Sequence, residues 1–255
     1  MSKTIVEAKV LGQRILSKDV KLLEVFAADI ACVAQPGQFV NVQVSKQVAP
    51  LLRRPLGVAE VNKEAGTLTL IYRIMGEATE ILSEVCSGDL ISIIGPLGRG
   101  FDLSSKRPLL VGGGLGLAPL LYLAQSFPQQ SVDIVMGGRT DKELFWTELF
   151  CDSVNNIYIT TDDGSQGTKG TVNALLPQLV KNGEYDCVYV CGPVPMMKAV
   201  AKVVEEAGIA CQVSLEKYMA CGLGACMSCS CGGVGKRLKV CTDGPVFWST
   251  EVEEW

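Results

Sequence analysis

Histidine is absent from this chain of 255 residues, and its absence removes several kinds of function. Without imidazole there is no Ser-His-Asp or Cys-His catalysis, no His-ligated zinc, and no histidine acting as a general base near neutrality. Basic blocks are lacking as well, because 23 lysines and arginines stand against 27 aspartates and glutamates, for a net charge of −4. We therefore expect no nucleic-acid partner, since such partners need clustered positive charge.

Long apolar runs are also missing. The longest, from Leu109 to Ala124, is interrupted by four glycines and a proline, which makes it too short and too broken to cross a bilayer. The first residues, MSKTIVEAKV, contain no apolar signal region. We expect a cytoplasmic protein that makes no membrane contact. Its length suits one large domain or two modest ones, at roughly 100–200 residues per domain.

The first hundred residues have the pattern of short strands. Segments rich in Val, Ile and Leu are separated by Gly, Pro, Asn and Asp, which predicts a closed or nearly closed antiparallel barrel. One helix interrupts them, with Thr79 as its N-cap and its end near Cys86. The expected strands are 4–11, 20–27, 38–44, 56–61, 67–74 and 89–95.

The pattern of apolar residues changes after Arg107, where expected buried strands alternate with expected helices. This alternation predicts a doubly wound parallel sheet, whose ligands bind at the carboxyl ends of the strands. The expected strands are 108–113, 132–138, 156–161, 186–192 and 209–217. The expected helices are 117–126, 141–150, 172–180 and 195–207.

The chain beyond Tyr218 is rich in glycine and cysteine and lacks periodicity, so we expect it to be organised around something other than an apolar core. The predicted fold class is α/β plus β: an antiparallel barrel domain over 1–102, an α/β nucleotide domain over 103–213, and a small cysteine-rich segment over 214–255.

Cysteine is the frequent residue among those that could ligate a metal through sulfur or nitrogen, with 11 cysteines and no histidine, and its distribution along the chain is uneven. Cysteines in apolar settings act as small buried hydrophobes, which we expect for six of them. These are Cys32, Cys86, Cys151, Cys187, Cys191 and Cys211. A cluster at the C-terminal end of a cytoplasmic chain indicates metal or redox chemistry rather than disulfides.

Four cysteines of that cluster have the C-x4-C-x2-C…C spacing of plant-type ferredoxins, which hold a 2Fe-2S cluster on four thiolates. They are Cys221, Cys226, Cys229 and Cys241, and Cys231 is then a spare neighbour. Glycines 222 and 224 let the backbone curl closely around such a cluster. Structural zinc is the alternative, although zinc cysteines usually form two C-x2-C knuckles.

Flavin signals occur in the barrel region. The segment Arg53 to Gly57 places two arginines beside a proline, which by itself describes a solvated rim as well as a phosphate site. The segments 71–73 (Ile-Tyr-Arg) and 76–79 (Gly-Glu-Ala-Thr), the second opening a helix, favour the phosphate site. Tyr72 offers an aromatic wall for a flavin ring, with ordinary core packing as the alternative.

A glycine-rich turn, Gly112 to Gly116, follows the strand 108–113 and opens a helix, as in nucleotide sites. It is neither a G-x-G-x-x-G fingerprint nor a P-loop. A second turn, Cys191-Gly192-Pro193, ends a later strand of the same predicted sheet.

These motifs, together with GGRTDKELFW, TDDGSQGTKG, SLEKYMACGLGACMSCSCG and KVCTDGPVF, resemble the ferredoxin–NADP reductase superfamily over residues 1 to about 210. Over the whole chain they resemble the family of class 1B dihydroorotate dehydrogenase electron transfer subunits. The chain departs from the superfamily at Leu56 and Gly57, which replace an aromatic residue and a serine, and at Ala78, which replaces glycine.

The resemblance implies three groups and the residues that hold them. FAD is expected at Arg54, Pro55, Leu56, Gly57, Ile71, Tyr72, Arg73, Ala78 and Thr79. NAD is expected at Gly112, Gly113, Gly114, Gly116, Cys191, Gly192 and Pro193, and the 2Fe-2S cluster at Cys221, Cys226, Cys229 and Cys241.

The resemblance also implies an oxidoreductase subunit of pyrimidine biosynthesis with no catalytic side chain of its own. Electrons from dihydroorotate, oxidised on an FMN-containing catalytic subunit in a heterotetramer of two plus two, would pass through the cluster and FAD to NAD+. Two alternatives stay open: a related reductase subunit for a hydrogenase, sulfur reductase or transhydrogenase, and a zinc-stapled nucleotide-binding module without redox function.

Overall fold

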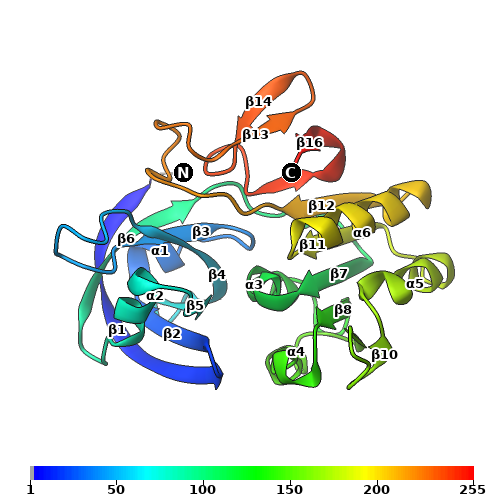
Figure 1. Ribbon diagram of the computed structural model, residues 1–255, viewed down its shortest axis with the longest axis horizontal. Helices are drawn as coiled ribbons and strands as arrows, with labels where there is room; N and C mark the ends of the chain where they lie inside the picture. Colours follow the sequence, from blue (N-terminus) through cyan, green and yellow to red (C-terminus); the bar gives the residue numbers. More distant parts are fainter. Residues whose placement is uncertain (1–2) are drawn as a thin grey trace.

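The structure, a computed structural model, describes residues 3–255 apart from the side chain of Glu254. Two lobes stand side by side, and the C-terminal segment lies across their top (Figure 1). The first lobe is a barrel, and the second is a sheet covered by helices, as the alternation of apolar segments predicts.

The barrel is closed and antiparallel, with strand order β1-β2-β5-β4-β3-β6. Its strands are β1 Thr4–Ser17, β2 Val20–Phe26, β3 Phe39–Val42, β4 Arg54–Asn62, β5 Thr67–Arg73 and β6 Leu90–Leu97. Side chains alternate across β5: Leu70 and Tyr72 fill the barrel, whereas Ile71 packs in the core cluster that the second lobe shares. This period of two follows from the pleat of a strand.

Two short helices belong to the barrel, α1 Ala28–Ala31 and α2 Glu77–Ser83. The expected helix over Thr79 to Cys86 therefore starts earlier, and Thr79 is not its N-cap. Gly76 holds that position, and the Thr79 hydroxyl accepts hydrogen bonds from the backbone N–H groups of Met75 (2.8 Å) and Gly76 (3.2 Å). Glycine has no side chain to accept hydrogen bonds from the free N–H groups at the start of a helix. The threonine at the third helical position accepts them instead.

The second lobe is built on a seven-stranded sheet of order β10-β9-β8-β7-β11-β12-β15. Its strands are β7 Pro108–Gly113, β8 Asp133–Gly138, β9 Asn156–Thr161, β10 Thr168–Lys169, β11 Cys187–Cys191, β12 Ala210–Ser214 and β15 Val246–Trp248. All neighbours are parallel except β15, which pairs antiparallel with β12. The order reverses between β7 and β11, and this switch point is where α/β sheets bind ligands.

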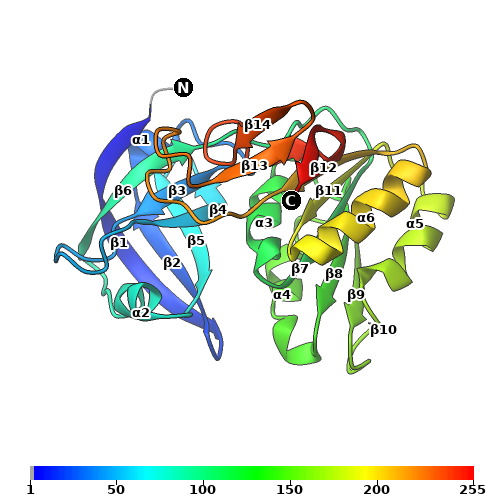
Figure 2. The same ribbon diagram turned by 45° about the horizontal axis from the view of Figure 1, so that its top comes forward.

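Helices cover both faces of this sheet (Figure 2). On one face lie η1 Gly114–Gly116, α3 Leu117–Gln125, η2 Asp141–Glu143 and α4 Trp146–Phe150; on the other lie η3 Val172–Ala174, α5 Leu176–Asn182 and α6 Val194–Glu206. Successive residues of β7 face opposite ways, with Leu110 in one core cluster and Leu109 and Val111 in the other.

Two of the expected helices are broken. The expected helix 172–180 is interrupted because Pro177 lacks an N–H group, so α5 begins anew around it. The expected helix 141–150 is split into η2 and α4 at Leu144, whose backbone (φ −102°, ψ 25°) leaves the helical region.

The C-terminal segment forms a small sheet of order β14-β13-β16. Its elements are β13 Ser230–Gly233, β14 Lys236–Lys239, η4 Ser249–Glu251 and β16 Val252–Glu254. The expectation that this segment lacks an apolar core is wrong. Leu238, Val240 and Phe247 are buried in the same core cluster as β11 and α6. The reason is that β15 pairs with β12, which brings the C-terminal segment against the core of the nucleotide sheet.

The six expected core cysteines divide into two groups. Cys187, Cys191 and Cys211 are buried, as predicted, whereas Cys32, Cys86 and Cys151 are exposed. Cys32 and Cys151 lie directly after the short helices α1 and α4, where the chain turns toward solvent. No helix within residues 3–255 has the length and apolar character to cross a membrane.

Candidate functional site

The two arginines at the start of β4 have different surroundings. Arg53 is held inside the barrel wall by hydrogen bonds to the Ser92 carbonyl (2.9 Å), the Ser92 hydroxyl (3.0 Å) and Gln43 Oε1 (3.0 Å). Burial lowers the pKa of Arg53, a shift that Glu7 opposes. Arg54 donates instead to the carbonyl of Leu52 (2.5 Å) at the rim. Of the two, Arg54 is the one positioned to meet an anionic ligand.

The end of β5 brings Ile71 and Arg73 toward the second lobe, whereas Tyr72 points the other way. The Tyr72 ring is buried in the barrel and its hydroxyl donates to Gln13 Oε1 (2.7 Å). Its side chain therefore does not form an aromatic wall for a flavin, and that expectation is wrong. The reason is the alternation of the strand, which leaves only the Tyr72 backbone at the lobe interface.

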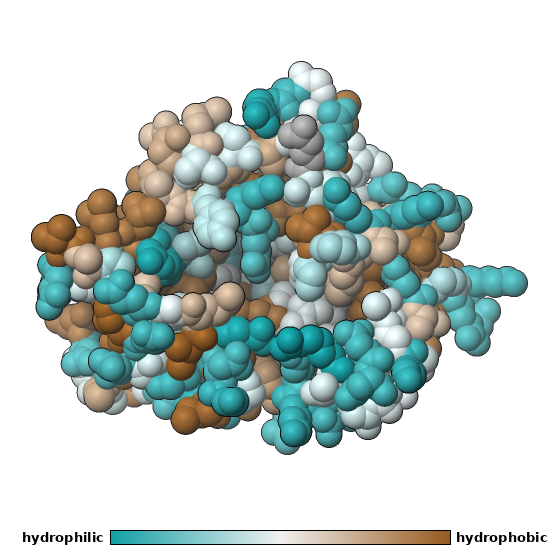
Figure 3. Space-filling model, viewed as in Figure 1, coloured by the Kyte–Doolittle hydropathy of each residue, from teal (hydrophilic) through white to brown (hydrophobic). Residues whose placement is uncertain are grey.

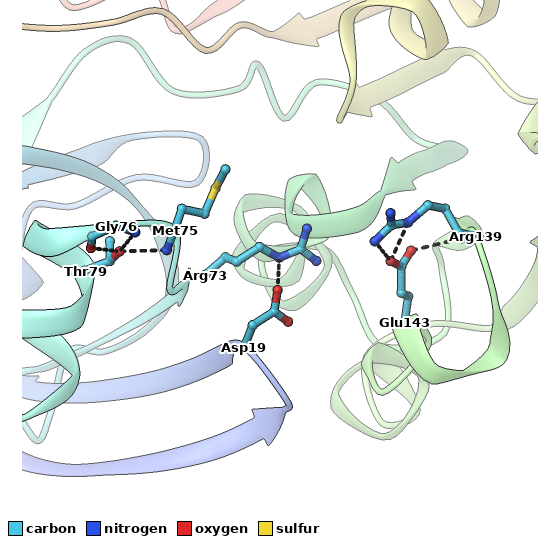
Figure 4. A network of polar contacts seen from close by, with 7 residues as sticks. All are labelled: Asp19, Arg73, Met75, Gly76, Thr79, Arg139 and Glu143. Atoms are coloured by element: carbon cyan, nitrogen blue, oxygen red, sulfur yellow. Dashed lines mark hydrogen bonds and ion pairs between the residues drawn. The ribbon is translucent and has the colours of Figure 1, made fainter.

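The beginning of α2 stands beside β5, with Ala78 buried and Thr79 at the surface of the site. Arg73 forms an ion pair with Asp19 (Nε to Oδ2, 3.2 Å), which lies next to the start of β2. Figure 4 shows Arg73 pointing from the barrel toward the second lobe, between Thr79 on one side and Arg139 on the other. The predicted flavin residues thus share one edge of the barrel.

The glycines of the predicted nucleotide site meet at the switch point of the sheet. Gly112 lies opposite Cys191 in the parallel pairing of β7 with β11. A Cβ atom added to Gly116 would lie 2.5 Å from the backbone of Cys191 and Gly192, and one added to Gly192 would lie 3.1 Å from the Gly113 nitrogen. Only glycine allows the two turns to touch, so their backbones meet at the edge of the sheet where α/β folds bind the pyrophosphate of a dinucleotide.

The flavin and nucleotide groups adjoin one another through α3. A Cβ atom on Gly57 would lie 3.7 Å from Cβ of Pro119, which follows the glycine-rich turn. Farther along the same helix, the Tyr122 hydroxyl donates to the Ala34 carbonyl (3.0 Å) and Gln125 donates to Glu60 Oε1 (2.6 Å). This helix fixes the two lobes against each other, so ligands in the two sites would be neighbours.

Side-chain hydrogen bonds join the four predicted ligand cysteines in two pairs, Cys221 with Cys226 and Cys229 with Cys241. Cys241 also interacts with Cys221, and Cys229 with Cys231, through charge alone. Backbone N–H groups point at the sulfurs: that of Leu223 lies 3.3 Å from Cys221 Sγ, and that of Cys221 lies 3.5 Å from Cys226 Sγ. Among the side chains that the structure describes, no three potential ligands surround a single point. Four thiolates in two pairs would suit a two-iron cluster, in which each iron takes two thiolates.

The local chemistry of the cysteines also fits a cluster. Hydrogen bonding to the Ser228 hydroxyl and to the Cys221 backbone lowers the pKa of Cys226 to about 6. Burial, and next the neighbouring Cys229, raise the pKa of Cys241 to about 12, so this thiol needs a metal to ionise near neutrality. Within the described residues the buried Thr242 hydroxyl, adjacent to Cys241, has no hydrogen-bond partner and is free to donate to a cluster sulfur.

Cys231 lies outside both pairs. It is buried in β13, opposite Leu238 of β14, and burial raises the pKa of its thiol.

The glycines of the cysteine loop adopt the left-handed backbone that a tight curl around a cluster needs, with φ of +68° at Gly222 and +87° at Gly224.

The cysteine loop is attached to the barrel by Asn41 of β3. Its amide donates to the Cys221 carbonyl (3.5 Å), and a Cβ atom on Gly222 would lie 2.6 Å from the same amide nitrogen. Asn41 also lies opposite Pro55 in the pairing of β3 with β4. Its Oδ1 atom is buried and, in the described part of the chain, unpartnered, so a donor from a ligand bound beside Pro55 would fit it.

Sequence reasoning missed three features of this region. Asn41 was missed, although asparagine is depleted in strands, so a single asparagine inside the apolar run 38–44 was the available signal. Glu216 lies two residues after β12 and is exposed, and its charge, after burial of the thiol itself, raises the pKa of Cys191. Arg139 and Glu143, which follow β8, form an ion pair (Nη2 to Oε1, 2.5 Å). A charged residue just after a buried strand was the available signal for the last two.

Comparison with known proteins agrees with this geometry. The fold is that of the ferredoxin reductases: a ferredoxin NADP+ reductase from Neisseria gonorrhoeae with bound FAD and NADP has a TM-score of 0.64 at 18% identity, over 80% of this chain and 92% of its own. A chain of an NADH-dependent reduced ferredoxin-NADP oxidoreductase has a TM-score of 0.86 at 30% identity, over 98% and 90%.

Two family models match the chain, the oxidoreductase NAD-binding domain over residues 110–202 and the iron-sulfur cluster binding domain of dihydroorotate dehydrogenase B over residues 216–253. Electron transfer subunits of dihydroorotate dehydrogenase B (NAD(+)) are similar along the chain. That of Desulforamulus reducens is 39% identical over 99% of both chains, and that of Caldanaerobacter subterraneus subsp. tengcongensis is 43% identical over 85% and 86%. The chain belongs to the family of dihydroorotate dehydrogenase B electron transfer subunits.

Proposed function

We propose that this chain carries electrons from dihydroorotate, oxidised on an FMN-containing catalytic subunit, to NAD+ in the biosynthesis of pyrimidines. When bound at its site, the 2Fe-2S cluster would supply one-electron exchange. FAD and NAD would supply hydride exchange with each other. The observation that carries the proposal is the contact of Asn41 with Cys221, since the same residue lies opposite Pro55 in the barrel. It joins the cysteine loop to the flavin edge.

For FAD, we assign the rim of the barrel next to the second lobe. Arg54 would provide a charged contact to the pyrophosphate, and the backbone of β4 and β5 would line the ring. Thr79 keeps the start of α2 in shape by accepting from the N–H groups of Met75 and Gly76. The residues assigned are Arg54, Pro55, Leu56, Gly57, Ile71, Tyr72, Arg73, Ala78 and Thr79.

For NAD, we assign the two turns at the switch point of the sheet. The close contact between them, which only glycine permits, would let their backbone approach a pyrophosphate, and the contact of Gly57 with Pro119 would set the nicotinamide side against the barrel. The residues assigned are Gly112, Gly113, Gly114, Gly116, Cys191, Gly192 and Pro193. Cys191 contributes through its backbone, because its thiol is buried in the sheet.

For the cluster, we assign Cys221 and Cys226 to one iron and Cys229 and Cys241 to the other. Their pairing and the N–H groups aimed at the sulfurs support this assignment. We also propose that the chain divides into a barrel domain (1–102), a nucleotide domain (103–213) and a cluster segment (214–255).

The partner would dock over the cluster. Leu223 and Met227 of the cysteine loop are 42% and 52% exposed, and Tyr218 just before the loop is 96% exposed. Met219 is different, because it packs against the core. Apolar side chains exposed beside the cluster would bring the catalytic subunit close to it. We propose a heterotetramer of two such pairs, working in the cytoplasm, where its eleven free cysteines would stay reduced.

Co-expression with an FMN-containing catalytic subunit tests the proposal. We expect the purified complex to contain FAD, iron and acid-labile sulfide, and to reduce NAD+ when dihydroorotate is added. The chain by itself should oxidise NADH with an artificial acceptor but should not oxidise dihydroorotate. A colourless, iron-free protein would contradict the proposal.

A second candidate is a reductase subunit that shares all three groups but serves another partner. The similarity to a chain of an NADH-dependent reduced ferredoxin-NADP oxidoreductase favours this candidate. Co-purification discriminates between the two, since the second predicts NADH oxidation coupled to an acceptor other than orotate.

A further inference from the structure

Gly224 is the point where the cysteine loop meets the turn that carries Cys241. The Gly224 N–H donates to the Cys241 sulfur, and the Gly224 carbonyl accepts from the Lys239 ammonium (3.3 Å). A Cβ atom on Gly224 would lie 2.8 Å from Cγ2 of Thr242, 3.5 Å from its Oγ1 and 3.6 Å from Lys239 Nζ. The side chains of Lys239 and Thr242 therefore both lie against the cysteine loop, although neither residue is a predicted ligand.

The turn from Lys239 to Gly244 is fixed by hydrogen bonds of its own. The Lys239 carbonyl accepts from the N–H groups of the three residues that close the turn, Thr242 (3.1 Å), Asp243 (2.8 Å) and Gly244 (3.3 Å). In the other direction, the Lys239 N–H donates to the Asp243 carboxylate (2.7 Å). Because the backbone is held at both ends of the turn, the side chains of Lys239 and Thr242 meet the cysteine loop in a defined position.

The cysteine loop has no charged side chain of its own. Residues 218–235 contain no aspartate, glutamate, lysine or arginine. The surface over the loop is coloured beige to white in Figure 3, whereas the neighbouring hairpin of β13 and β14 is largely hydrophilic. None of the ion pairs among the described residues includes Lys239. Lys239 therefore brings a positive charge that no described carboxylate pairs with into direct contact with this loop.

Both groups would act in the same direction on a cluster held by the cysteine loop. One-electron reduction adds a negative charge to the irons and sulfurs, so a nearby cation and a hydroxyl that donates to sulfur both stabilise the reduced form. The Oγ1 atom of Thr242 is buried and has no hydrogen-bond partner within the described residues. A buried hydroxyl without a partner costs free energy, and a hydrogen bond to a cluster sulfur would remove that cost.

We propose that Lys239 and Thr242 raise the reduction potential of the 2Fe-2S cluster, Lys239 through its positive charge and Thr242 through a hydrogen bond to sulfur. The inference rests on the proposed function, because it takes the four cysteines to hold such a cluster. It goes further by naming two residues outside the ligand set that decide how readily one electron enters the cluster from the catalytic subunit.

The test measures the midpoint potential of the cluster in the full-length, cofactor-loaded chain. Dithionite reduces the protein stepwise in the presence of mediator dyes, and EPR detects the reduced cluster. We expect Lys239→Met and Thr242→Val each to make reduction about tenfold less favourable, which for a one-electron couple is a fall of about 59 mV. Added salt should shrink the effect of Lys239→Met but not that of Thr242→Val, because Lys239 is partly exposed and salt screens its charge.

Lys236→Met and Thr250→Val are the matched controls, since both side chains are exposed in the same C-terminal segment, and they should keep the wild-type potential. Iron and sulfide per chain show whether each variant holds its cluster, and Lys239→Gln or Thr242→Ala replaces a variant that does not. An unchanged or raised potential in either variant, an equal fall in its control, or an effect of Lys239→Met that salt does not reduce overturns the inference for that residue alone. A wild type without iron, or without the EPR signal of a reduced 2Fe-2S cluster, overturns the proposed function with it.

Discussion

The side-chain amide of Asn41 donates a hydrogen bond to the backbone carbonyl of Cys221, 3.5 Å away. This contact joins the C-terminal cysteine loop to the barrel strand β3. The two residues are 180 positions apart in the chain. Gly222 makes the contact possible, because a Cβ atom there would lie 2.6 Å from the amide nitrogen. This buried polar side chain therefore contributes to holding the cysteine loop at the flavin edge, alongside the backbone hydrogen bond from the Arg99 N–H to the Gly244 carbonyl (2.5 Å).

Replacing Asn41 with alanine should loosen this attachment. Loss of one net hydrogen bond from a buried residue corresponds to about 1 kcal/mol, and a fall of Tm by about 3 °C for a chain of this size. We also expect slower reduction of the cluster by NADH, with flavin reduction unchanged, in stopped-flow absorbance. Asn182→Ala, at the exposed end of α5, is the control. Equal rates in both variants would show that Asn41 has no part in coupling the sites.

Cys226 and Cys231 differ in their expected roles although both belong to the cysteine cluster. Cys226→Ser should abolish the cluster, measured as iron and sulfide per chain, because Cys226 pairs with Cys221. Cys231→Ala should retain the full iron content, because its thiol is buried in β13, outside both pairs. Iron loss in the Cys231 variant would mean that the ligands have been assigned wrongly.

Gly116 should be intolerant of a side chain. In Gly116→Ala the new Cβ atom would stand 2.5 Å from the backbone of Cys191 and Gly192, so the two turns must separate. We expect NADH affinity to fall by about tenfold, with the destabilisation of about 1–3 kcal/mol that overpacking brings. FAD content should be unchanged. Gly12→Ala is the matched control, since nothing lies within 4 Å of its Cβ position, and it should keep wild-type affinity.

Asp186 should make stability depend on acid pH. Its carboxylate accepts from the N–H groups of Lys106 (2.9 Å) and Arg107 (3.2 Å) and from the Ser105 hydroxyl. Burial acts to raise its pKa, but these hydrogen bonds outweigh it and place the pKa below the ordinary 3.8. A lowered folded-state pKa stabilises the protein above pH 3.8 and is lost as the pH falls through the folded-state value.

Thermal unfolding of Asp186→Asn as a function of pH measures this contribution. At pH 7 we expect a Tm about 2 °C below the wild type, which corresponds to less than 1 kcal/mol. The difference should shrink below pH 4 as the wild-type carboxylate is protonated. Asp152→Asn, an exposed residue after α4, should show no such trend. A difference that does not depend on pH would exclude the carboxylate charge as its cause.

Much of the fold could be predicted because apolar residues recur with the period of each element. The strands 108–113 and 156–161 have the bounds that the sequence predicts, since Gly, Pro and Asn mark their ends. The antiparallel strand β15 was missed, because its three residues are too few to show a period. The side of β5 on which Tyr72 lies was also beyond sequence reasoning, since both faces of that strand are buried. The flavin and NAD residues remain predictions.

The sequence by itself determined the barrel, the alternating nucleotide lobe and the four-cysteine spacing, because all of these depend on residue types at short separations. The tertiary structure decided which residues meet: Gly57 with Pro119, Asn41 with Cys221, and Cys229 with Cys241. It also showed that Glu143 closes on Arg139 rather than pointing to solvent. Such contacts depend on the packing of distant segments, which a local pattern of residues does not encode.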